Sequence, residues 1–361
     1  MRVAFRADAS VKTGSGHVMR CLTLAEELRG QGAECSFICK EHDGNLINKI
    51  RAMGFPVCVL DLSSDQNQDE DQYLSWLGGT WQDDAARTLQ YLKQGADWLI
   101  VDHYSLDFRW ESLLASAVRK VMVIDDLANR MHACDLLLDQ NLGRTEQDYV
   151  DLVPEQCACL TGPEYALLRT EFSEWRKRSL DRKSHFSGIK RVLISMGGSD
   201  PDNTTEWAME LLARTRLDDS TVLDIVMGAS SPHLEQVRRA SSLSRFNSAV
   251  SVNVANMAER MAMSDLSVGA AGSTAWERCC LGLPSLMLVL AENQRLIAEK
   301  VQSFGAGVVL KGVGSFDASL GQIEALLFKP EAVAEMNRLA ALVCDGLGRG
   351  RVAGRIMGGH F

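Results

Sequence analysis

The amino-acid sequence predicts an α/β protein with two Rossmann-like domains that face a cleft. Its 361 residues are enough for about two domains of roughly 150 residues each. Strand-like and helix-like segments alternate along the first half, and the alternation starts again near Arg191. A charged segment at 166–188 separates the two series and is typical of a helix followed by a linker. Such alternation predicts mostly parallel sheets with helices on both faces.

In the first half, short apolar runs predict the strands, and apolar residues at helical spacing predict the helices. The helix expected at 18–29, for example, places Val18, Cys21 and Ala25 along one face. The expected strands are 2–7, 35–39, 57–60, 98–101 and 120–124, and the expected helices are 18–29, 46–53 and 83–94. The polar residues 63–79 are expected to form an irregular surface excursion.

The second half begins after a charged helix that is expected from Glu164 to Lys183. The expected strands there are 192–195, 222–226, 249–252, 266–269 and 285–290. These elements predict domains at 1–165 and 189–345, a helix and linker at 166–188, and a tail at 346–361. Ligands of such sheets bind beyond the carboxyl ends of the strands, so the residues that follow a strand are candidate site residues.

The composition excludes several classes of protein. Apolar residues make up 46% and charged residues 24%, which is typical of a soluble globular protein. The longest apolar run, 281–291, contains Pro284 and is too short to span a membrane. Arg6 and Asp8 interrupt the first apolar run, so we expect no signal peptide, no membrane partner and a cytoplasmic location.

The net charge and the cysteine content further limit the classes of binding partner that we expect for this protein. The net charge is −9, and no basic run is long enough to follow a nucleic-acid backbone, so we expect no nucleic-acid partner. The ten cysteines have no zinc-finger spacing and are expected to be reduced thiols. The expected partner is a small molecule, which can be an anion because loops and helix starts bind anions without net positive charge.

The first loop that could carry catalytic or ligand-binding residues is 13–17, between the first strand and the first helix. It is not the dinucleotide fingerprint, because Met19 stands where the third glycine belongs. Gly14 and Gly16 would still let the backbone approach a ligand. His17 falls in the first turn of the helix, where the helix dipole favours a neutral imidazole that can accept a proton. We predict that His17 is a general base; the alternative is a histidine that only caps a turn.

Two further glycine-containing loops open helices in the second half. Gly197 and Gly198 lie between a strand and a helix, which is either anion-binding geometry or an ordinary tight turn. The following Asp200-Pro201-Asp202 is a metal–diphosphate motif or a helix start with an acidic cap and Pro just inside; we favour the helix start. Asn203, next in the chain, is a candidate nucleotide-binding residue.

The other loop, 269–274, follows the strand at 266–269. Ser273 and Thr274 stand at the start of the next helix and are candidate nucleotide-binding residues. Glu277 lies about one turn further, where its carboxylate could accept both hydroxyls of a ribose. The alternative is an acidic residue that only suits the positive end of the helix.

Polar residues also follow three other strands. Asp102, His103 and Tyr104 follow a buried strand, and Asp125 and Asp126 follow the next one; these residues are either catalytic or caps of the following helices. Asn293, after the strand at 285–290, is either a sugar or phosphate contact or an ordinary loop residue.

Together these motifs resemble the PseG family, the UDP-2,4-diacetamido-2,4,6-trideoxy-β-L-altropyranose hydrolases of pseudaminic acid biosynthesis. The resemblance is carried, in order, by residues 5–8, 14–21, 101–104, 124–127, 134–141, 162–169, 196–200, 270–277 and 292–294. The second half alone also resembles MurG-type glycosyltransferases, but the Gly-x-Gly-His opening combined with Asp-His-Tyr separates the two families. Residues 63–79 and the chain beyond about Gly346 match neither family.

The resemblance implies a GT-B fold with UDP bound mainly by the C-terminal domain. It gives His17 the place of the catalytic base, Tyr104 that of a substrate contact, Asn293 that of a polar residue near the sugar, and Glu277 that of the ribose ligand. The implied reaction is hydrolysis of a UDP-linked 2,4-diacetamido-2,4,6-trideoxy sugar with inversion, releasing UDP and the free sugar. UDP is a good leaving group, so the reaction needs a base and dipoles that hold the diphosphate, and no metal or cofactor is expected.

Two other functions stay open from the sequence. One is a MurG-like inverting UDP-sugar glycosyltransferase, and the other is a nucleotide-sugar-binding protein without turnover. A redox enzyme of the Rossmann type is disfavoured by the incomplete glycine fingerprint.

Overall fold

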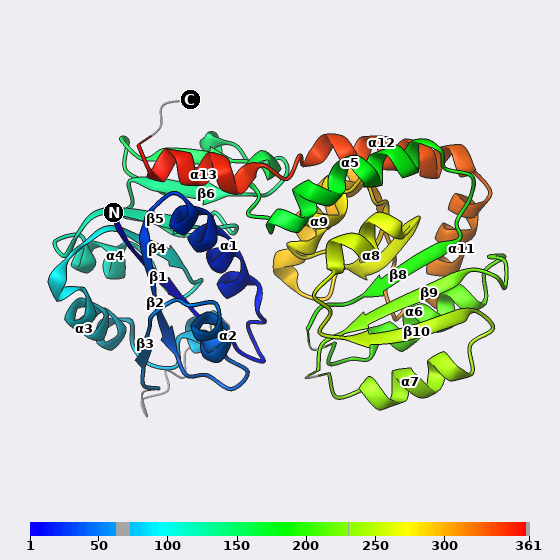
Figure 1. Ribbon diagram of the computed structural model, residues 1–361, viewed down its shortest axis with the longest axis horizontal. Coiled ribbons are helices and arrows are strands. Elements are labelled where there is room, and N and C mark those ends of the chain that lie inside the picture. The colour runs from blue at the N-terminus through cyan, green and yellow to red at the C-terminus, as the bar shows by residue number, and fades with distance from the viewer. Residues whose placement is uncertain (63–72, 199, 230, 359–361) are drawn as a thin grey trace. The chain divides into compact units, whose positions relative to one another are not determined.

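The computed structural model describes residues 1–62, 73–198, 200–229 and 231–358, and its chain forms two compact units. Unit 1 comprises Met1–Leu167 and Leu347–Phe361, and unit 2 comprises Leu168–Gly346. Each unit is built on one parallel sheet with helices packed against it (Figure 1). The predicted fold class of two Rossmann-like α/β domains is therefore confirmed.

Unit 1 contains a seven-stranded sheet in the order β3-β2-β1-β4-β5-β6-β7, in which every neighbouring pair is parallel. Its strands are β1 (Arg2–Ala7), β2 (Glu34–Lys40), β3 (Val57–Leu60), β4 (Ala96–Asp102), β5 (Val118–Ile124), β6 (Leu136–Asp139) and β7 (Ala158–Thr161). Its helices are α1 (Gly16–Gly30), α2 (Ile47–Ala52), α3 (Trp81–Tyr91), α4 (Phe108–Leu114) and α13 (Gly348–Ile356).

Both faces of this sheet are buried, as expected for strands connected by crossover helices. Phe5 and Ile100 belong to the core on the face covered by α1, α2 and α13, whereas Ala4 and Leu99 belong to the core beneath α3 and α4 (Figure 1). This burial on two faces explains why the strands appear in the sequence as continuous apolar runs.

Unit 2 contains a six-stranded parallel sheet in the order β10-β9-β8-β11-β12-β13. The crossover between β8 and β11 reverses the direction in which strands are added, so the switch point of a Rossmann-type sheet lies between these two strands. The strands are β8 (Arg191–Ser195), β9 (Val222–Met227), β10 (Asn247–Val252), β11 (Leu266–Ala270), β12 (Ser285–Leu288) and β13 (Gly307–Val309). The helices are α5 (Thr170–Ser184), α6 (Thr204–Ala213), α7 (Leu234–Ser242), α8 (Met257–Met263), α9 (Thr274–Cys280), α10 (Arg295–Ser303), α11 (Phe316–Leu327) and α12 (Pro330–Val343).

Several expected boundaries differ from the structure. The helix expected from Glu164 begins only at Thr170, because Gly162 has a φ of 109° and the following Pro163–Tyr165 forms a 3-10 turn. The expected strand 285–290 ends at Leu288. Three strands were missed, β6, β7 and β13, each of which has four residues or fewer. Within the expected excursion 63–79, residues 63–72 lie outside the described residues, and Leu74–Leu77 forms a 3-10 turn.

The domain division also differs from the expected one at both joints. The expected helix and linker at 166–188 contains α5, which is part of unit 2. The expected tail at 346–361 contains α13, which returns to unit 1 and places Val352 and Ile356 in the core beside α1. Gly348 permits this return, because a Cβ there would lie 2.4 Å from the carbonyl carbon of Tyr165.

In the described ranges of the chain, no helix is long and apolar enough to cross a membrane.

Candidate functional site

His17 and Asp102 form a hydrogen-bonded pair at the carboxyl edge of the unit 1 sheet. His17 is the second residue of α1, and Asp102 is the last residue of β4. The distance from His17 Nδ1 to Asp102 Oδ1 is 2.6 Å. A carboxylate only accepts hydrogen bonds, so this contact assigns the proton of a neutral imidazole to Nδ1 and leaves Nε2 as the acceptor. The pair therefore has the arrangement of a general base and the group that orients it.

Arg20 holds Asp102 in place from the next turn of α1. Its guanidinium donates to both carboxylate oxygens of Asp102, with distances of 2.6 Å from Nε and from Nη2. A third nitrogen donates to Asp126 Oδ2 at 3.0 Å. Burial alone would raise the pKa of Asp102, but Arg20 and His17 hold it below its usual range. Asp102 thus stays ionised and fixed, which keeps the His17 ring in one orientation.

Tyr104 packs its ring edge to face against His17, with ring centroids 4.7 Å apart and an interplanar angle of 87°. The side chains of Tyr73 and Trp76 complete an aromatic group, with centroids 5.2 and 5.8 Å from that of Tyr104. Two of the predicted catalytic residues, His17 and Tyr104, are therefore brought together in unit 1. Asn293 belongs to unit 2.

The loop before α1 has the backbone conformation that its glycines favour. Gly14 has a φ of 74° and donates its N–H to the carbonyl of Ser10 at 2.9 Å, which closes a tight turn. Gly16 is the first residue of α1. Gly14, Ser15 and Gly16 are exposed, so their backbone is accessible to a ligand beside His17.

His103 takes part in a separate group beside the sheet. Its Nδ1 accepts from the backbone N–H of Ser105 at 3.1 Å, so its protonated Nε2 faces Asp8 Oδ2 at 3.4 Å. His42 Nε2 lies 3.7 Å from the same carboxylate oxygen. Asp102 and His103 are thus adjacent in sequence but belong to different networks, and only Asp102 touches His17.

In unit 2, Gly197 and Gly198 follow β8, and their loop packs against the loop that follows β9. Gly197 has a φ of 100°. A Cβ on Gly228 would lie 1.9 Å from the carbonyl oxygen of Gly198, so only glycine permits this approach. Both Gly197 and Gly198 are exposed at the carboxyl edge of the sheet. Ser199 lies outside the described residues.

Asp200 caps α6, as the sequence predicted, but the predicted position of Pro201 inside the helix is wrong. The Asp200 carboxylate accepts from the backbone N–H groups of Thr204 and Thr205 at 2.8 and 3.0 Å. The helix begins at Thr204, because Asp200 and Asn203 have positive φ angles of 41° and 54° and form a turn before it. The N–H groups of Thr204 and Thr205 at the start of α6 are therefore already occupied by a carboxylate.

Asn203 stands at the N-cap of α6, and its side-chain Nδ2 donates to Glu206. Its Oδ1 is buried without a hydrogen-bond partner. The amide is thus engaged on one side only, and its predicted role in nucleotide binding stays a prediction.

The loop between β11 and α9 lies beside the turn that carries Asn293. Ser273 is the N-cap of α9 and Thr274 its first residue, and both are exposed. Asn293 is half-buried in the 3-10 turn Glu292–Gln294. A Cβ on Gly272 would lie 4.0 Å from Gln294 Nε2, which places this turn next to the loop.

Glu277 is half-buried in the first turn of α9. Its Oε1 lies 3.7 Å from Nη2 of Arg169, which also pairs with Glu171 at 2.7 Å. Burial raises the pKa of Glu277 to about 7, while Arg169 acts in the opposite direction. The carboxylate is held at a long ion-pair distance by a cation that has another partner, so it has capacity to accept further hydrogen bonds.

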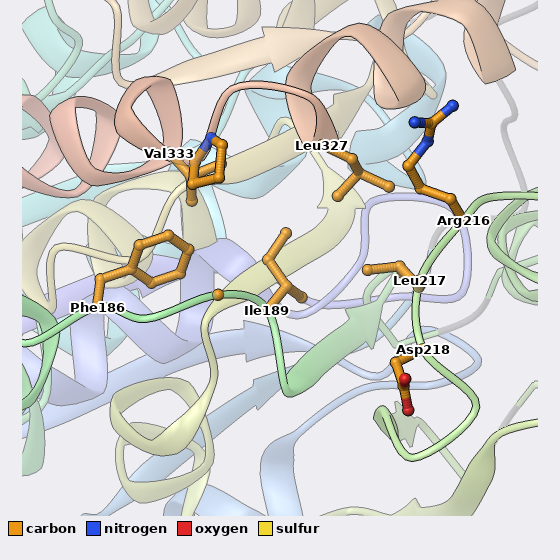
Figure 2. A pocket seen from close by; sticks show the side chains of 9 residues that line it. Phe186, Ile189, Arg216, Leu217, Asp218, Leu327 and Val333 are labelled. Carbon is orange, nitrogen blue, oxygen red and sulfur yellow. The ribbon is translucent and has the colours of Figure 1, made fainter.

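One pocket of unit 2 does not fit as the nucleotide site, because it lies at the wrong edge of the sheet. It has a volume of about 210 Å³ and is lined mainly by apolar side chains, among them Phe186, Ile189 and Leu327 (Figure 2). Its residues Ile189 and Leu217 precede β8 and β9, so the pocket lies at the amino ends of these strands. The loops that carry the predicted site residues follow the carboxyl ends instead.

No group of three or more His, Cys, Asp or Glu side chains in the described ranges has the geometry to hold a metal ion. The Asp200 carboxylate is engaged by α6, which supports the capping interpretation of Asp200-Pro201-Asp202.

From the sequence, Asp102 and Asp126 were named only among alternatives, and no role was given to Arg20. Asp102 is 85 positions from His17 and Asp126 is 106 positions from Arg20. A polar residue at the carboxyl end of each central strand was the available signal, but it does not reveal which pairs meet.

The chain is 28% identical over 312 residues to the UDP-2,4-diacetamido-2,4,6-trideoxy-beta-L-altropyranose hydrolase of Campylobacter jejuni, which covers 86% of this chain and 100% of that protein. It is 30% identical over 161 residues to the spore coat polysaccharide biosynthesis protein SpsG of Bacillus subtilis, which covers 42% of this chain and 43% of that protein. The resemblance inferred from the sequence motifs is thereby confirmed. No family model matches the chain.

Among solved structures, MurG of Acinetobacter baumannii superposes with a TM-score of 0.70 at 16% identity, covering 99% of both chains. The spinosyn rhamnosyltransferase SpnG superposes with a TM-score of 0.60 at 16% identity, covering 98% of this chain and 99% of that chain. At this level of identity the similarity establishes the fold, which is of the GT-B type.

Proposed function

We propose that this protein hydrolyses a UDP-linked 2,4-diacetamido-2,4,6-trideoxy sugar and releases UDP and the free sugar. The observation that carries the proposal is the His17–Asp102 pair. It supplies an oriented base, with Nε2 as its acceptor, in a chain that is similar over 86% of its length to a hydrolase of such a UDP-sugar.

In the proposed reaction, His17 Nε2 takes a proton from water while the water oxygen attacks the anomeric carbon. The bond from this carbon to the phosphate oxygen breaks, and its electron pair leaves with UDP. A single displacement of this kind inverts the anomeric centre. Since UDP is a stable leaving group, the main demands are a positioned base and stabilisation of the diphosphate charge.

Asp102 has a defined part in this scheme. It accepts from Nδ1–H and stabilises the imidazolium that forms when Nε2 takes the proton. Arg20 keeps this carboxylate in place through two hydrogen bonds of 2.6 Å. Tyr104, packed on the imidazole, would limit its rotation and contact the sugar.

Unit 2 would bind the nucleotide in this proposal. The exposed backbone of Gly197 and Gly198, together with Ser273 and Thr274, would hold the diphosphate, and Glu277 would accept the ribose hydroxyls. Asn293, next to loop 270–273, would contact the sugar or a phosphate. A cytoplasmic location and independence of metals are part of the same proposal.

The fold supports a second candidate, an inverting UDP-sugar glycosyltransferase, because MurG superposes along nearly the whole chain. A base paired with a carboxylate would serve a sugar hydroxyl as well as water. A binding protein without turnover is the third candidate.

One experiment separates these three functions. The protein is incubated with a panel of UDP-sugars and no acceptor, and free UDP and the anomeric form of the released sugar are measured. We expect UDP release with inversion, fastest for the 2,4-diacetamido-2,4,6-trideoxy sugar, and its loss in His17→Asn. Release only after addition of an acceptor identifies a transferase, and tight binding without release identifies a binding protein.

A further inference from the structure

Arg278 is a buried arginine beneath loop 270–273 of unit 2. It lies on α9 with 2% of its surface exposed. Its Nη2 donates to the carbonyl oxygen of Ala270, the last residue of β11, at 2.8 Å. Its Nη1 occupies space that only glycine leaves open, because a Cβ on Gly269 would lie 2.6 Å away. The guanidinium is therefore built tightly into the base of this loop.

The guanidinium has no ion-pair partner in the described part of the chain, and the opposite charge of Glu277 acts on it only from a longer distance. No carboxylate there forms an ion pair with it, and its Nε is buried without a hydrogen-bond partner. The adjacent Glu277 is turned toward Arg169 instead. Arg6 of unit 1 is also buried, but its charge is compensated in the usual way. Its guanidinium forms ion pairs with Asp8 and Asp84 at 2.7 Å each.

Burial without a countercharge is costly for a cation. Burial lowers the pKa of Arg278 to about 10 although Glu277 acts in the opposite direction, so the side chain still carries its charge at neutral pH. A buried charge that the protein leaves without an ion pair suggests that a ligand completes its compensation.

The position of Arg278 in unit 2 indicates which part of a nucleotide ligand would compensate its charge. A small cavity of about 20 Å³ is lined by Arg278 together with Ser195 and Thr274. Ser195 ends β8 just before Gly197 and Gly198, and Thr274 begins α9. Arg278 therefore lies under both loops that hold the diphosphate in the proposed function. The cavity has room for about one water molecule, so the guanidinium acts across the loops without touching the ligand.

The positive charge of Arg278 would stabilise a diphosphate that the N-termini of α6 and α9 do not stabilise. The first N–H groups of α6 are already bound by the Asp200 carboxylate, and α9 has only seven residues. Neutral groups alone, the loop backbone and the hydroxyls of Ser273 and Thr274, would then face the charge of a diphosphate. A fixed cation in a low-dielectric interior acts on such a charge more strongly than one in water.

We propose that Arg278 is a positioning residue whose countercharge is the diphosphate of the bound nucleotide. It fixes the end of β11 through the Ala270 carbonyl and provides positive potential under the two loops. The inference rests on the proposed function, because it requires a nucleotide diphosphate at this edge of unit 2.

The test compares UDP with uridine as ligands of two variants. Arg278→Gln keeps a donor for the Ala270 carbonyl but removes the charge, and Arg278→Lys keeps the charge. We expect the glutamine variant to bind UDP at least tenfold more weakly, about 1.4 kcal/mol, with its affinity for uridine unchanged. The lysine variant should retain most of the UDP affinity. Calorimetry measures both ligands.

Arg176→Gln is the matched control. Arg176 is also in unit 2, but carbonyl oxygens bind its guanidinium, including those of Cys344 at 2.9 Å and Ala341 at 2.7 Å. Its replacement should lower the unfolding temperature without changing the ratio of UDP to uridine affinity.

The unfolding temperature of the free protein gives a second readout. Removing an uncompensated charge should leave this temperature unchanged or raise it in Arg278→Gln. Equal losses of UDP and uridine affinity, or an unchanged UDP affinity, would overturn the inference and leave Arg278 a structural residue. If the wild-type protein itself does not bind UDP, the proposed function fails first, and this inference fails with it.

Discussion

His17 and Asp102 connect the start of α1 with the end of β4 through a contact of 2.6 Å between Nδ1 and Oδ1. Arg20, one turn along the same helix, donates to both oxygens of the same carboxylate. The helix therefore supplies both the base and the cation that fixes the base's partner. A helix held on the sheet by Leu22 and Leu24, both fully buried, gives this arrangement little freedom to move.

His17→Asn is expected to lower turnover by roughly 10²–10⁴, because asparagine has a similar reach but cannot take a proton. UDP affinity should stay near that of the wild type, since the nucleotide is assigned to unit 2. Turnover is measured as UDP release and affinity by calorimetry. Near-normal turnover would reject His17 as the base and direct attention to Asp102 and Tyr104.

Asp102→Asn tests the orienting role of the carboxylate. We expect turnover to fall by roughly 10²–10⁴, because the amide no longer enforces the Nδ1–H tautomer or stabilises the imidazolium. Arg20 would also lose its buried partner, which costs about 3–5 kcal/mol in comparable cases, so the unfolding temperature should fall. The assay is therefore run well below that temperature. Full activity in a destabilised variant would show that Asp102 serves only the fold.

Glu277→Ala is expected to weaken UDP binding at least tenfold, because each lost hydrogen bond to a charged acceptor is worth about 1.5–3 kcal/mol at most. Uridine binding should fall by a similar factor, in contrast to Arg278→Gln. The unfolding temperature of the free protein should barely change. Unaltered UDP binding by calorimetry would contradict the ribose assignment.

The pH dependence of binding gives an independent test of Glu277. Burial raises the pKa of this carboxyl to about 7, so protonation removes its charge as the pH falls from 8 to 6. A neutral carboxyl is a weaker acceptor for ribose hydroxyls, so wild-type affinity for uridine should decrease over this range. Glu277→Gln should show weak binding with no such pH dependence. A wild-type affinity that is constant from pH 8 to 6 would contradict the assignment.

Activity is expected to survive excess chelator. The Asp200 carboxylate is occupied by two N–H groups of α6, and the proposed reaction uses a good leaving group with fixed positive charge nearby. UDP release is compared before and after chelator treatment, with added Mg²⁺ or Mn²⁺ as the control. Loss of activity that either metal restores would show that the capping interpretation is wrong.

Stability should depend on pH through Asp139. The hydroxyl of Tyr149 lies 2.9 Å from Asp139 Oδ2 and 3.0 Å from Asp125 Oδ2, but it has one proton to donate. Burial raises the pKa of Asp139 to about 7 although Arg144 Nε lies 3.1 Å from the same Oδ2, so this carboxyl can supply the second proton. Because its folded pKa exceeds the unfolded one, the contribution is complete below about pH 4 and is lost as the pH rises through 7.

Asp139→Asn should remove this contribution. The free energy of unfolding, measured with urea at pH 5 and pH 8, should then differ less between the two conditions than in the wild type. The same difference in both proteins would mean that Asp139 is ionised throughout.

Much of the fold could be predicted from the sequence, because its signals are local. Strands such as β8 and β12 are apolar runs, since both faces of each sheet are covered. Glycines mark loops such as 13–17 and 196–200, where the backbone turns from a strand into a helix. In a parallel sheet these loops fall at one edge, so the order of elements alone located His17, Gly197 and Glu277 at the ends where ligands bind.

The tertiary structure decided which of these residues meet. Asp102 reaches His17 only because β4 pairs with β1, which places the end of β4 beside the start of α1. The return of α13 to unit 1 depends on a close contact at Gly348 that has no sequence pattern. Whether Arg278 forms an ion pair depends on where Glu277 and Arg169 lie, because Coulombic pairing is set by distance in space. The sequence by itself determined most of the strands, the loops and the edge at which they lie, and packing across the chain decided the charges and partners of the site.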